Sequence, residues 1–131
     1  MIHAEKRLSN GRLVGCCHCQ AVVFSIPVET DFQTASRCDC SFCRRRWAVT
    51  ASVPMDQLML HQGVEALTLY TWNSGVARHY FCRRCGIYTF HRRRSDPDEY
   101  GVNIGCFPHI DIHDWKDTPI TDGINHPSDA G

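Results

Sequence analysis

Residues 66–86, ALTLYTWNSGVARHYFCRRCG, contain the pattern that decides the fold. Two runs rich in β-branched and aromatic residues, 66–72 and 76–81, flank the turn sequence Asn73-Ser74-Gly75, which predicts an antiparallel hairpin. The second run leads directly into Cys82-Arg83-Arg84-Cys85-Gly86. Two cysteines at this spacing place two thiolates on one tight turn, and the glycine that follows lets the backbone turn around the sulfur. The stretch therefore predicts a β-hairpin that ends in half of a metal site.

Two further cysteine clusters precede the hairpin. They are Cys17-x-Cys19 and Cys38-x-Cys40-x-x-Cys43. The chain has nine cysteines in 131 residues, an odd number that does not suit a complete disulfide framework. Zinc is the usual metal for clustered thiolates. An iron–sulfur cluster is the alternative, but only residues 38–43 are dense enough, and they lack a suitably spaced fourth thiolate.

The rest of the chain is a series of short strands separated by turn residues. We expect strands near 13–15, 21–26, 34–37, 48–53, 87–91 and 100–104, one or two helical turns over 55–60, and an irregular surface tail from Phe107 onward. No repeat, low-complexity tract or linker interrupts the pattern. The predicted fold class is mostly β: a compact single domain over residues 1–131, made of small antiparallel sheets held together by zinc knuckles.

The charge balance excludes several classes of protein. Lys plus Arg and Asp plus Glu are 14 each, so the formal net charge is zero, which argues against a dedicated nucleic-acid or membrane-surface binder. No apolar run approaches the ~20 residues that span a bilayer. Residues 1–13 are polar and do not resemble a signal peptide. We expect a cytoplasmic protein with reduced thiols and neither a nucleic-acid nor a membrane partner.

The spacing of the cysteines favours two separate metal sites. Pairing the first and last clusters gives a closed four-thiolate site, which stabilises and does not catalyse; its ligands are Cys17, Cys19, Cys82 and Cys85. The other three, Cys38, Cys40 and Cys43, would leave one exchangeable position, which is typical of a catalytic zinc. Two alternatives stay open: a fourth ligand such as Cys106 or a histidine makes this second site structural, or the clusters pair differently.

These cysteine segments resemble the glutathione-dependent formaldehyde-activating enzyme family, which also includes centromere protein V. The matching stretches are 15–22, 38–44, 79–86, 97–106 and 122–127, so the resemblance covers about residues 12–127. It implies a compact mostly-β fold with two Zn²⁺ ions, one structural and one catalytic, held by the same two sets of cysteines. It also implies a carbon–sulfur lyase that joins glutathione to formaldehyde as S-hydroxymethylglutathione, or cleaves that adduct, with a small thiol as its partner.

A zinc ion held by three thiolates carries a formal negative charge and needs cations nearby. Arg44 and Arg45, with Arg46, follow the third cysteine, and we expect them to compensate this charge and to contact the glutathione carboxylates. The alternative is a solvated basic turn. The run Arg92-Arg93-Arg94 is interpreted as a solvated hairpin end.

Other candidate residues receive mainly structural interpretations. Cys16 is expected to be a buried free thiol and Cys106 a packed core thiol, while His18 and His79 neighbour predicted ligands and can hydrogen-bond to them. The sequence does not place His126, which could close over the site. The aromatic residues expected to pack in the core or on the sheets are Trp47, Tyr70, Trp72 and Phe81.

Two features depart from the family pattern: Asp39, where relatives often have histidine, and Arg45-Arg46-Trp47, which replaces small residues. They bear on the thiol substrate and leave the metal assignment unchanged. The competing functions are a non-catalytic thiol-binding carrier, a zinc-ribbon interaction module, and a dithiol redox role for Cys82 and Cys85. No sequence feature indicates the oligomeric state.

Overall fold

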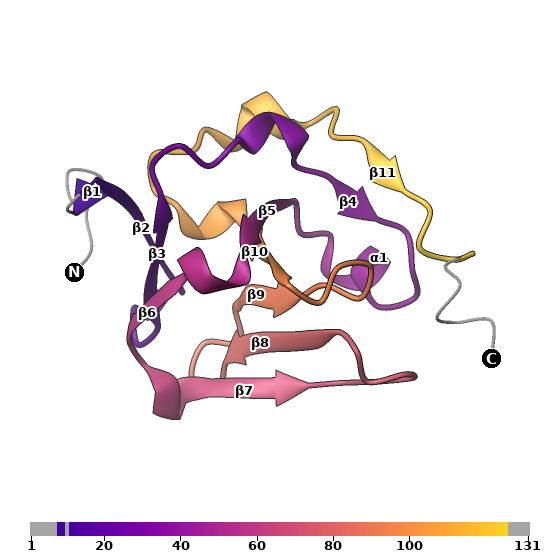
Figure 1. The fold of residues 1–131 in the computed structure, drawn as a ribbon, viewed down its shortest axis with the longest axis horizontal. Helices are drawn as coiled ribbons and strands as arrows, with labels where there is room; N and C mark the ends of the chain where they lie inside the picture. The colour runs from indigo at the N-terminus through magenta and orange to yellow at the C-terminus, as the bar shows by residue number, and fades with distance from the viewer. Residues whose placement is uncertain (1–7, 10, 126–131) are drawn as a thin grey trace.

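A computed structural model describes residues 8–9 and 11–125, which form three sheets (Figure 1). The first has the order β1-β2-β3-β6, with bounds Leu8–Ser9, Arg12–Cys16, Val23–Pro27 and Met59–Gln62. The second has the order β5-β10-β9-β8-β7, with bounds Thr50–Pro54, Glu99–Asn103, Tyr88–Arg92, Arg78–Cys82 and Leu67–Tyr70. The third pairs β11, Ile120–Thr121, with β4, Arg37–Cys38.

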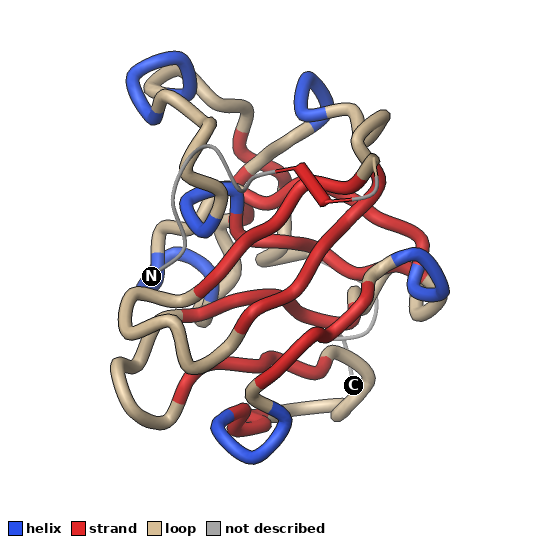
Figure 2. The backbone as a smooth tube through the Cα atoms, turned by 90° about the vertical axis from the view of Figure 1, so that its left-hand side faces the viewer, coloured by secondary structure: helices blue, strands red, loops and turns tan. Residues whose placement is uncertain are grey.

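The helices are short turns between these strands. The α-helix α1 spans Cys43–Arg46, and the 3₁₀ segments are Phe32–Thr34, Met55–Gln57, Val64–Ala66, Ile104–Cys106 and Ile112–Trp115. Figure 2 shows most of them at the periphery, around the crossing strands. No helix in the described part of the chain is long and apolar enough to cross a membrane. The mostly-β fold class predicted from the sequence is confirmed.

The core joins the first two sheets through aromatic rings. Phe24 on β3 is fully buried and meets Phe90 on β9 edge-on, with ring centroids 5.2 Å apart. Phe107, which follows the last buried 3₁₀ turn, meets Phe24 at 5.5 Å. Each such ring contributes roughly 1.5–3 kcal/mol on burial, so this trio holds the two sheets at a fixed distance from each other.

The predicted hairpin is present, but its strands are shorter than expected. β7 ends at Tyr70 and β8 begins at Arg78, with Tyr70 paired to His79 and Leu67 to Cys82. Residues 71–77 form a loop whose tip turns at Asn73 and Gly75, both with positive φ. The expected hairpin turn is therefore the end of a longer loop.

Two other segments differ from their sequence-based expectations. Of residues 55–60, only Met55–Gln57 is helical; from Met59 the chain is strand β6, because its backbone pairs with β3. The tail after Phe107 is not irregular throughout, since it contains the turn Ile112–Trp115 and strand β11. β11 lies beside β4 in parallel, a pairing between segments far apart in the chain (Figure 1).

Candidate metal centres and active site

Four cysteines from two turns form the first candidate metal centre. Cys17 and Cys19 lie between β2 and β3, Cys82 ends β8, and Cys85 lies between β8 and β9. Their four sulfurs lie within 4.8 Å of one another. The Sγ–Sγ distances are 3.7 Å for Cys17–Cys19 and 3.6 Å for Cys19–Cys82. A tetrahedron with metal–sulfur bonds of about 2.3 Å has edges of about 3.8 Å, so this spacing fits a zinc ion.

The two turns of this centre have the same backbone design. Gly86 follows the second cysteine of its turn with φ 79°, as the sequence predicted, and Gln20 takes the same role after Cys19 with φ 66°. Backbone N–H groups point at the sulfurs: Val22 N donates to Cys17 Sγ at 3.4 Å and Arg84 N to Cys82 Sγ at 3.3 Å. Such donors favour the thiolate form, which is the metal ligand.

Burial and hydrogen bonding act in opposite directions on these thiols. Burial raises the pKa of Cys17 to about 12. At Cys85 burial also raises the pKa, but hydrogen bonds from the backbone N–H groups of Cys19 and Ile87 outweigh it and lower the pKa to about 6. Four crowded thiols cannot all be ionised without a cation, and a divalent metal provides that cation.

The second candidate centre is a single loop with three cysteines. Cys38 ends β4 and Cys43 begins α1, and their sulfurs lie within 4.8 Å of each other and of Cys40 Sγ. The N–H of Cys43 donates to Cys40 Sγ at 3.3 Å. Hydrogen bonds from the Cys38 and Cys43 thiols lower the pKa of Cys40 far below its usual value, while the same contacts raise the pKa of Cys43.

This three-cysteine loop opens onto a cavity of about 250 Å³, which all three cysteines line. None of the four cysteines of the first centre lines it. The remaining wall comes from β4, α1, β5, β8, β9, the loop 71–77 and residues 93–95 and 121–123. A metal ion bound by the three sulfurs would therefore face this cavity. In the first centre Cys17 and Cys82 are almost fully buried, Cys85 is half-buried and Cys19 is exposed.

Strand β11 closes one side of the cysteine loop. Asp39 accepts hydrogen bonds from Gly123 N at 2.7 Å and Ile124 N at 3.2 Å, and Arg94 donates to Gly123 O at 3.2 Å. A Cβ built on Gly123 would stand 2.2 Å from Cys38 Sγ. Asp39 thus ties the end of the described chain to the three-cysteine loop.

Arg46 provides a half-buried positive charge beside the cysteines. Its guanidinium lies 3.8 Å from Cys43 Sγ, 3.0 Å from His79 Nδ1 and 3.5 Å from His91 Nδ1. It also lies over the rings of Tyr88 and Phe42, at 3.6 Å and 4.8 Å from their centroids. Cation–π contacts on both sides hold the group in one orientation.

The structure does not bring Arg44 and Arg45 to the cavity: both are exposed, and of the three arginines after Cys43 only Arg46 lines it. Arg93 and Arg94 also line it, so the interpretation of 92–94 as a solvated hairpin end is wrong for these two. Arg93 pairs with Glu99 at 3.7 Å and donates to Thr50 Oγ1 at 3.3 Å.

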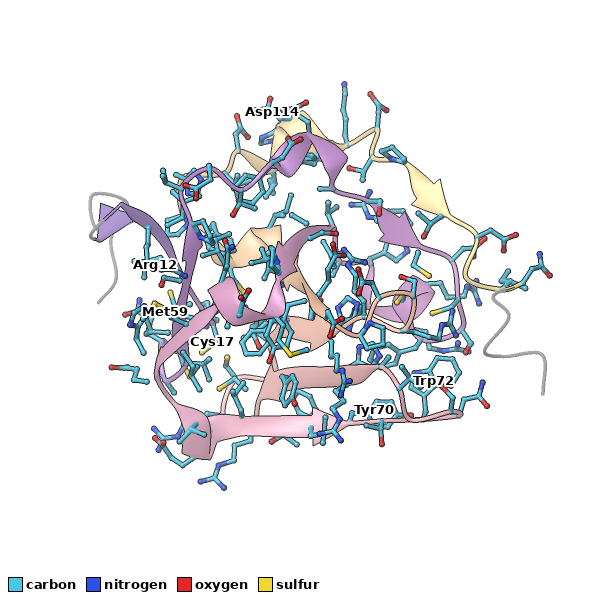
Figure 3. All side chains as sticks on the ribbon, viewed as in Figure 1. Arg12, Cys17, Met59, Tyr70, Trp72 and Asp114 are labelled. Atoms are coloured by element: carbon cyan, nitrogen blue, oxygen red, sulfur yellow. The ribbon has the colours of Figure 1, made fainter. Side chains whose placement is uncertain are left out.

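The aromatic residues near the cavity differ from expectation in one case. Trp47 is 64% exposed with φ 59°, and it covers the Arg37 guanidinium at 4.6 Å, so the prediction that it packs in the core is wrong. Tyr70 and Trp72 instead gather around Phe42, with centroids 5.4 and 6.4 Å from it. Figure 3 shows both on the side of the molecule that carries α1, away from Cys17.

The remaining predicted residues are placed as follows. Cys16, expected to be buried, is half-buried. Cys106 is buried, with its thiol 3.6 Å from Tyr88 O, as expected of a packed thiol. His18 is exposed. His79 lies in the three-cysteine cavity and not at the four-cysteine centre that it precedes in sequence. His126 lies outside the described residues.

Sequence reasoning missed His91, Arg93 and Tyr88 as parts of the site. Strand periodicity could have found two of them. His91 and Arg93 are two residues apart, so they point to the same face at β9. His91 on β9 also pairs directly with His79 on β8. Tyr88 had no comparable signal, because its contact with Arg46 depends on where α1 docks.

Comparison with known proteins agrees with this geometry. A solved crystal structure of a protein from Rhodobacter sphaeroides is similar, with 46% sequence identity and a TM-score of 0.80, over 83% of this chain and 100% of that one. The model of the family described as glutathione-dependent formaldehyde-activating enzyme matches residues 12–119, which contain all seven cysteines of the two centres. The chain therefore belongs to the glutathione-dependent formaldehyde-activating enzyme family.

Proposed function

We propose that the chain is a zinc-dependent carbon–sulfur lyase that joins glutathione, or a similar small thiol, to formaldehyde, or cleaves the resulting adduct. In this proposal Cys17, Cys19, Cys82 and Cys85 hold a structural zinc, and Cys38, Cys40 and Cys43 hold a catalytic one. The observation that carries the proposal is that the second group offers three sulfurs on one wall of a cavity, whereas the first offers four and is closed.

A zinc ion at the three-cysteine loop would supply an exchangeable position at which an incoming thiol loses its proton. The positive charge beside the three-cysteine loop suits this chemistry. Arg46 lies 3.8 Å from Cys43 Sγ and offsets the negative charge of the thiolates. Its half-buried position makes this interaction stronger than at a fully exposed surface.

The cavity also carries positive charge that suits an anionic thiol. Arg37, Arg93 and Arg94 line the cavity, against a single lining carboxylate, Asp122, which already accepts hydrogen bonds from Asn125. Guanidinium groups bind carboxylates in a two-pronged geometry, and glutathione carries two carboxylates. Trp72 and the loop 71–77 cover part of the cavity and limit the access of water.

The test combines metal content, binding and exchange. Zinc per chain, calorimetric glutathione binding, and the enzyme-dependent exchange between formaldehyde and S-hydroxymethylglutathione by NMR are measured for wild type, Cys43→Ala and Cys16→Ala. Because the adduct also forms spontaneously, only the part of the rate proportional to protein concentration counts. We expect two zinc ions in wild type and one in Cys43→Ala, with binding and exchange lost.

The control Cys16→Ala removes a thiol outside both groups and should behave as wild type. One zinc in both proteins, or glutathione binding unchanged in Cys43→Ala, contradicts the assignment of the second site. Binding without protein-dependent exchange would identify a thiol carrier in place of an enzyme.

A further inference from the structure

His79 occupies an unusual position beside the three-cysteine loop. It is 5% exposed, lines the cavity, and lies between two rings, with Phe42 at 4.4 Å and His91 at 5.0 Å between centroids. Across the strand pair, His79 is directly opposite His91. The ring is therefore held on both sides before any substrate enters.

The contact with Arg46 fixes the tautomer of this ring. Arg46 NH1 lies 3.0 Å from His79 Nδ1, and a guanidinium only donates hydrogen bonds, so Nδ1 must accept. A neutral imidazole whose Nδ1 accepts carries its hydrogen on Nε2. Burial and the neighbouring Arg46 charge lower the pKa of His79 to about 4, so the ring is neutral near pH 7.

The second ring nitrogen remains available. None of the described residues hydrogen-bonds to His79 Nε2. This nitrogen is also not fully enclosed by protein atoms. Because His79 lines the cavity that the cysteine thiols line, an N–H donor on Nε2 can reach a group bound there. A donor with no partner from the protein has to be satisfied by a ligand or by water.

We propose that His79, as a neutral imidazole, donates its Nε2 hydrogen bond to the carbonyl oxygen that becomes the hydroxyl of the thiol adduct, with Arg46 as the positioning residue that holds this tautomer. The inference rests on the function proposed above and adds the group that stabilises the developing oxygen charge.

The step balances without an oxidant or reductant. The thiolate sulfur forms a bond to the carbonyl carbon while the carbon–oxygen π bond breaks, and its electron pair moves to oxygen. The proton lost by the thiol is made up at that oxygen from water, so thiol plus aldehyde gives the hydroxymethyl thioether. In the reverse direction the carbon–sulfur bond breaks and the oxygen regains its double bond. The His79 hydrogen bond is strongest where oxygen carries most charge, between the two states.

His91 supports this arrangement and does not share the role. Its Nδ1 lies 2.6 Å from the Tyr88 hydroxyl, and Gly101 packs so closely that an added Cβ would meet the ring at 2.5 Å. The same Tyr88 ring lies under the Arg46 guanidinium. Together, His91 and Tyr88 form a fixed layer behind His79 and Arg46.

Four variants separate the donor from the packing. His79→Phe keeps a ring between Phe42 and His91 and removes the donor; His79→Gln restores an N–H close to the position of Nε2; Arg46→Met removes the tautomer lock. His113→Ala, at a side chain 89% exposed, is the control. Each is measured for zinc content, glutathione affinity and protein-dependent exchange, and imidazole tautomers are read from ¹⁵N–¹H NMR of the zinc-loaded protein.

We expect His79→Phe to retain zinc and glutathione binding and to lose about 10²–10³-fold in the exchange rate, as enzymes lose when one oxyanion donor is removed. His79→Gln should recover part of this loss, and His113→Ala should match wild type. The NMR spectrum should show His79 with hydrogen on Nε2 in wild type and a mixture of tautomers in Arg46→Met.

Two results overturn the inference while leaving the proposed function intact. One is exchange by His79→Phe at the wild-type rate; the other is a wild-type spectrum with the hydrogen on Nδ1. If wild type binds glutathione and shows no protein-dependent exchange, the proposed function fails and this inference fails with it. Should His79→Phe lose zinc, the tautomer of the wild-type ring decides.

Discussion

Gly123 lies against the candidate catalytic cysteines with no room for a side chain. An added Cβ would lie 2.2 Å from Cys38 Sγ and 2.9 Å from Cys40 Cβ, distances at which the atoms overlap. Its N–H and that of Ile124 share Asp39 as acceptor, so this segment after β11 cannot move away without breaking both hydrogen bonds. A side chain at position 123 must therefore displace the cysteine loop.

Gly123→Ala tests this close approach. We expect zinc to fall from two toward one per chain, because the displaced Cys38 no longer completes the three-sulfur set, while the fold is retained. Elemental analysis and circular dichroism measure the two effects. Ile120→Ala, at an exposed position of strand β11 three residues earlier, is the matched control and should keep two zinc ions. An alanine variant with unchanged zinc would show that the loop adapts.

Trp47 is the second residue under local constraint. It ends α1 with φ 59°, a left-handed conformation that costs a side chain with a Cβ about 1 kcal/mol relative to glycine. Trp47→Gly and Trp47→Ala both remove the ring over Arg37, but only glycine relieves the backbone. We expect the glycine variant to be more stable than the alanine variant by about 1 kcal/mol. Equal unfolding midpoints in urea would contradict this account of the helix end.

At the scale of elements, strands β8 and β9 carry two neutral histidines, and this makes stability depend on pH. Burial, then the Arg46 charge, lowers the pKa of His79 to about 4 and that of His91 well below its usual value. Below pH ~6.5 these two histidines bind protons in the unfolded chain but stay neutral in the folded chain. The free energy of unfolding therefore keeps its full contribution from these histidines above that pH, and loses it as the pH falls toward their folded pKa values.

The His79 contribution can be measured by difference. At pH 5 protonation of His79 in the unfolded state lowers the free energy of unfolding by about 2 kcal/mol. His79→Phe has no such proton to take up and avoids this loss. We expect the loss of stability between pH 7.5 and pH 5, from urea unfolding of zinc-loaded protein, to be smaller by about this amount in the variant. Acid release of zinc affects both proteins alike. Parallel pH curves would show that His79 does not titrate in this way.

Local patterns in the sequence predicted the elements that depend on local chemistry. The hairpin and the turn at Cys82–Cys85 follow from turn residues and cysteine spacing, and Gly86 has the positive φ that this turn requires. The helical expectation for residues 59–60 failed because pairing with β3 outweighed the local preference. The parallel pairing of β4 with β11 joins segments about 80 residues apart, and no local signal reports it.

The choice among the three arginines of α1 shows a signal that was available in the sequence. Residues three apart on a helix share a face, so Arg46 lies on the side of Cys43, and Arg44 and Arg45 point away. Helical geometry after a metal-binding cysteine would have selected Arg46. The cations Arg93 and Arg94 come from another strand end, and only the assembled sheets bring them to the same cavity.

At the scale of the whole molecule, the two cysteine groups differ in what they connect. The four-cysteine group joins the turn of β2–β3 to the turn of β8–β9, which belong to different sheets, and Cys17 and Cys82 are almost fully buried. The three-cysteine group lies within residues 38–43 and joins no two sheets. A metal ion bound at the first group would therefore restrain the fold, and one bound at the second would restrain one loop.

Removing one ligand from each group should separate these roles. Cys85→Ser leaves the first group with three thiolates, and because the free energy of metal binding there is also free energy of folding, we expect a melting temperature lower by more than about 10 °C. Cys43→Ser should lose one zinc and melt within a few degrees of wild type. Thermal unfolding by circular dichroism, with zinc measured on the same samples, checks both.

A chelator series provides a second measurement of the same difference. We expect removal of the first zinc to leave the melting curve nearly unchanged and removal of the second to unfold the chain. If both serine variants lose the same stability, the two sites are equally coupled to the fold, and the division into a structural and a catalytic zinc fails on its structural side.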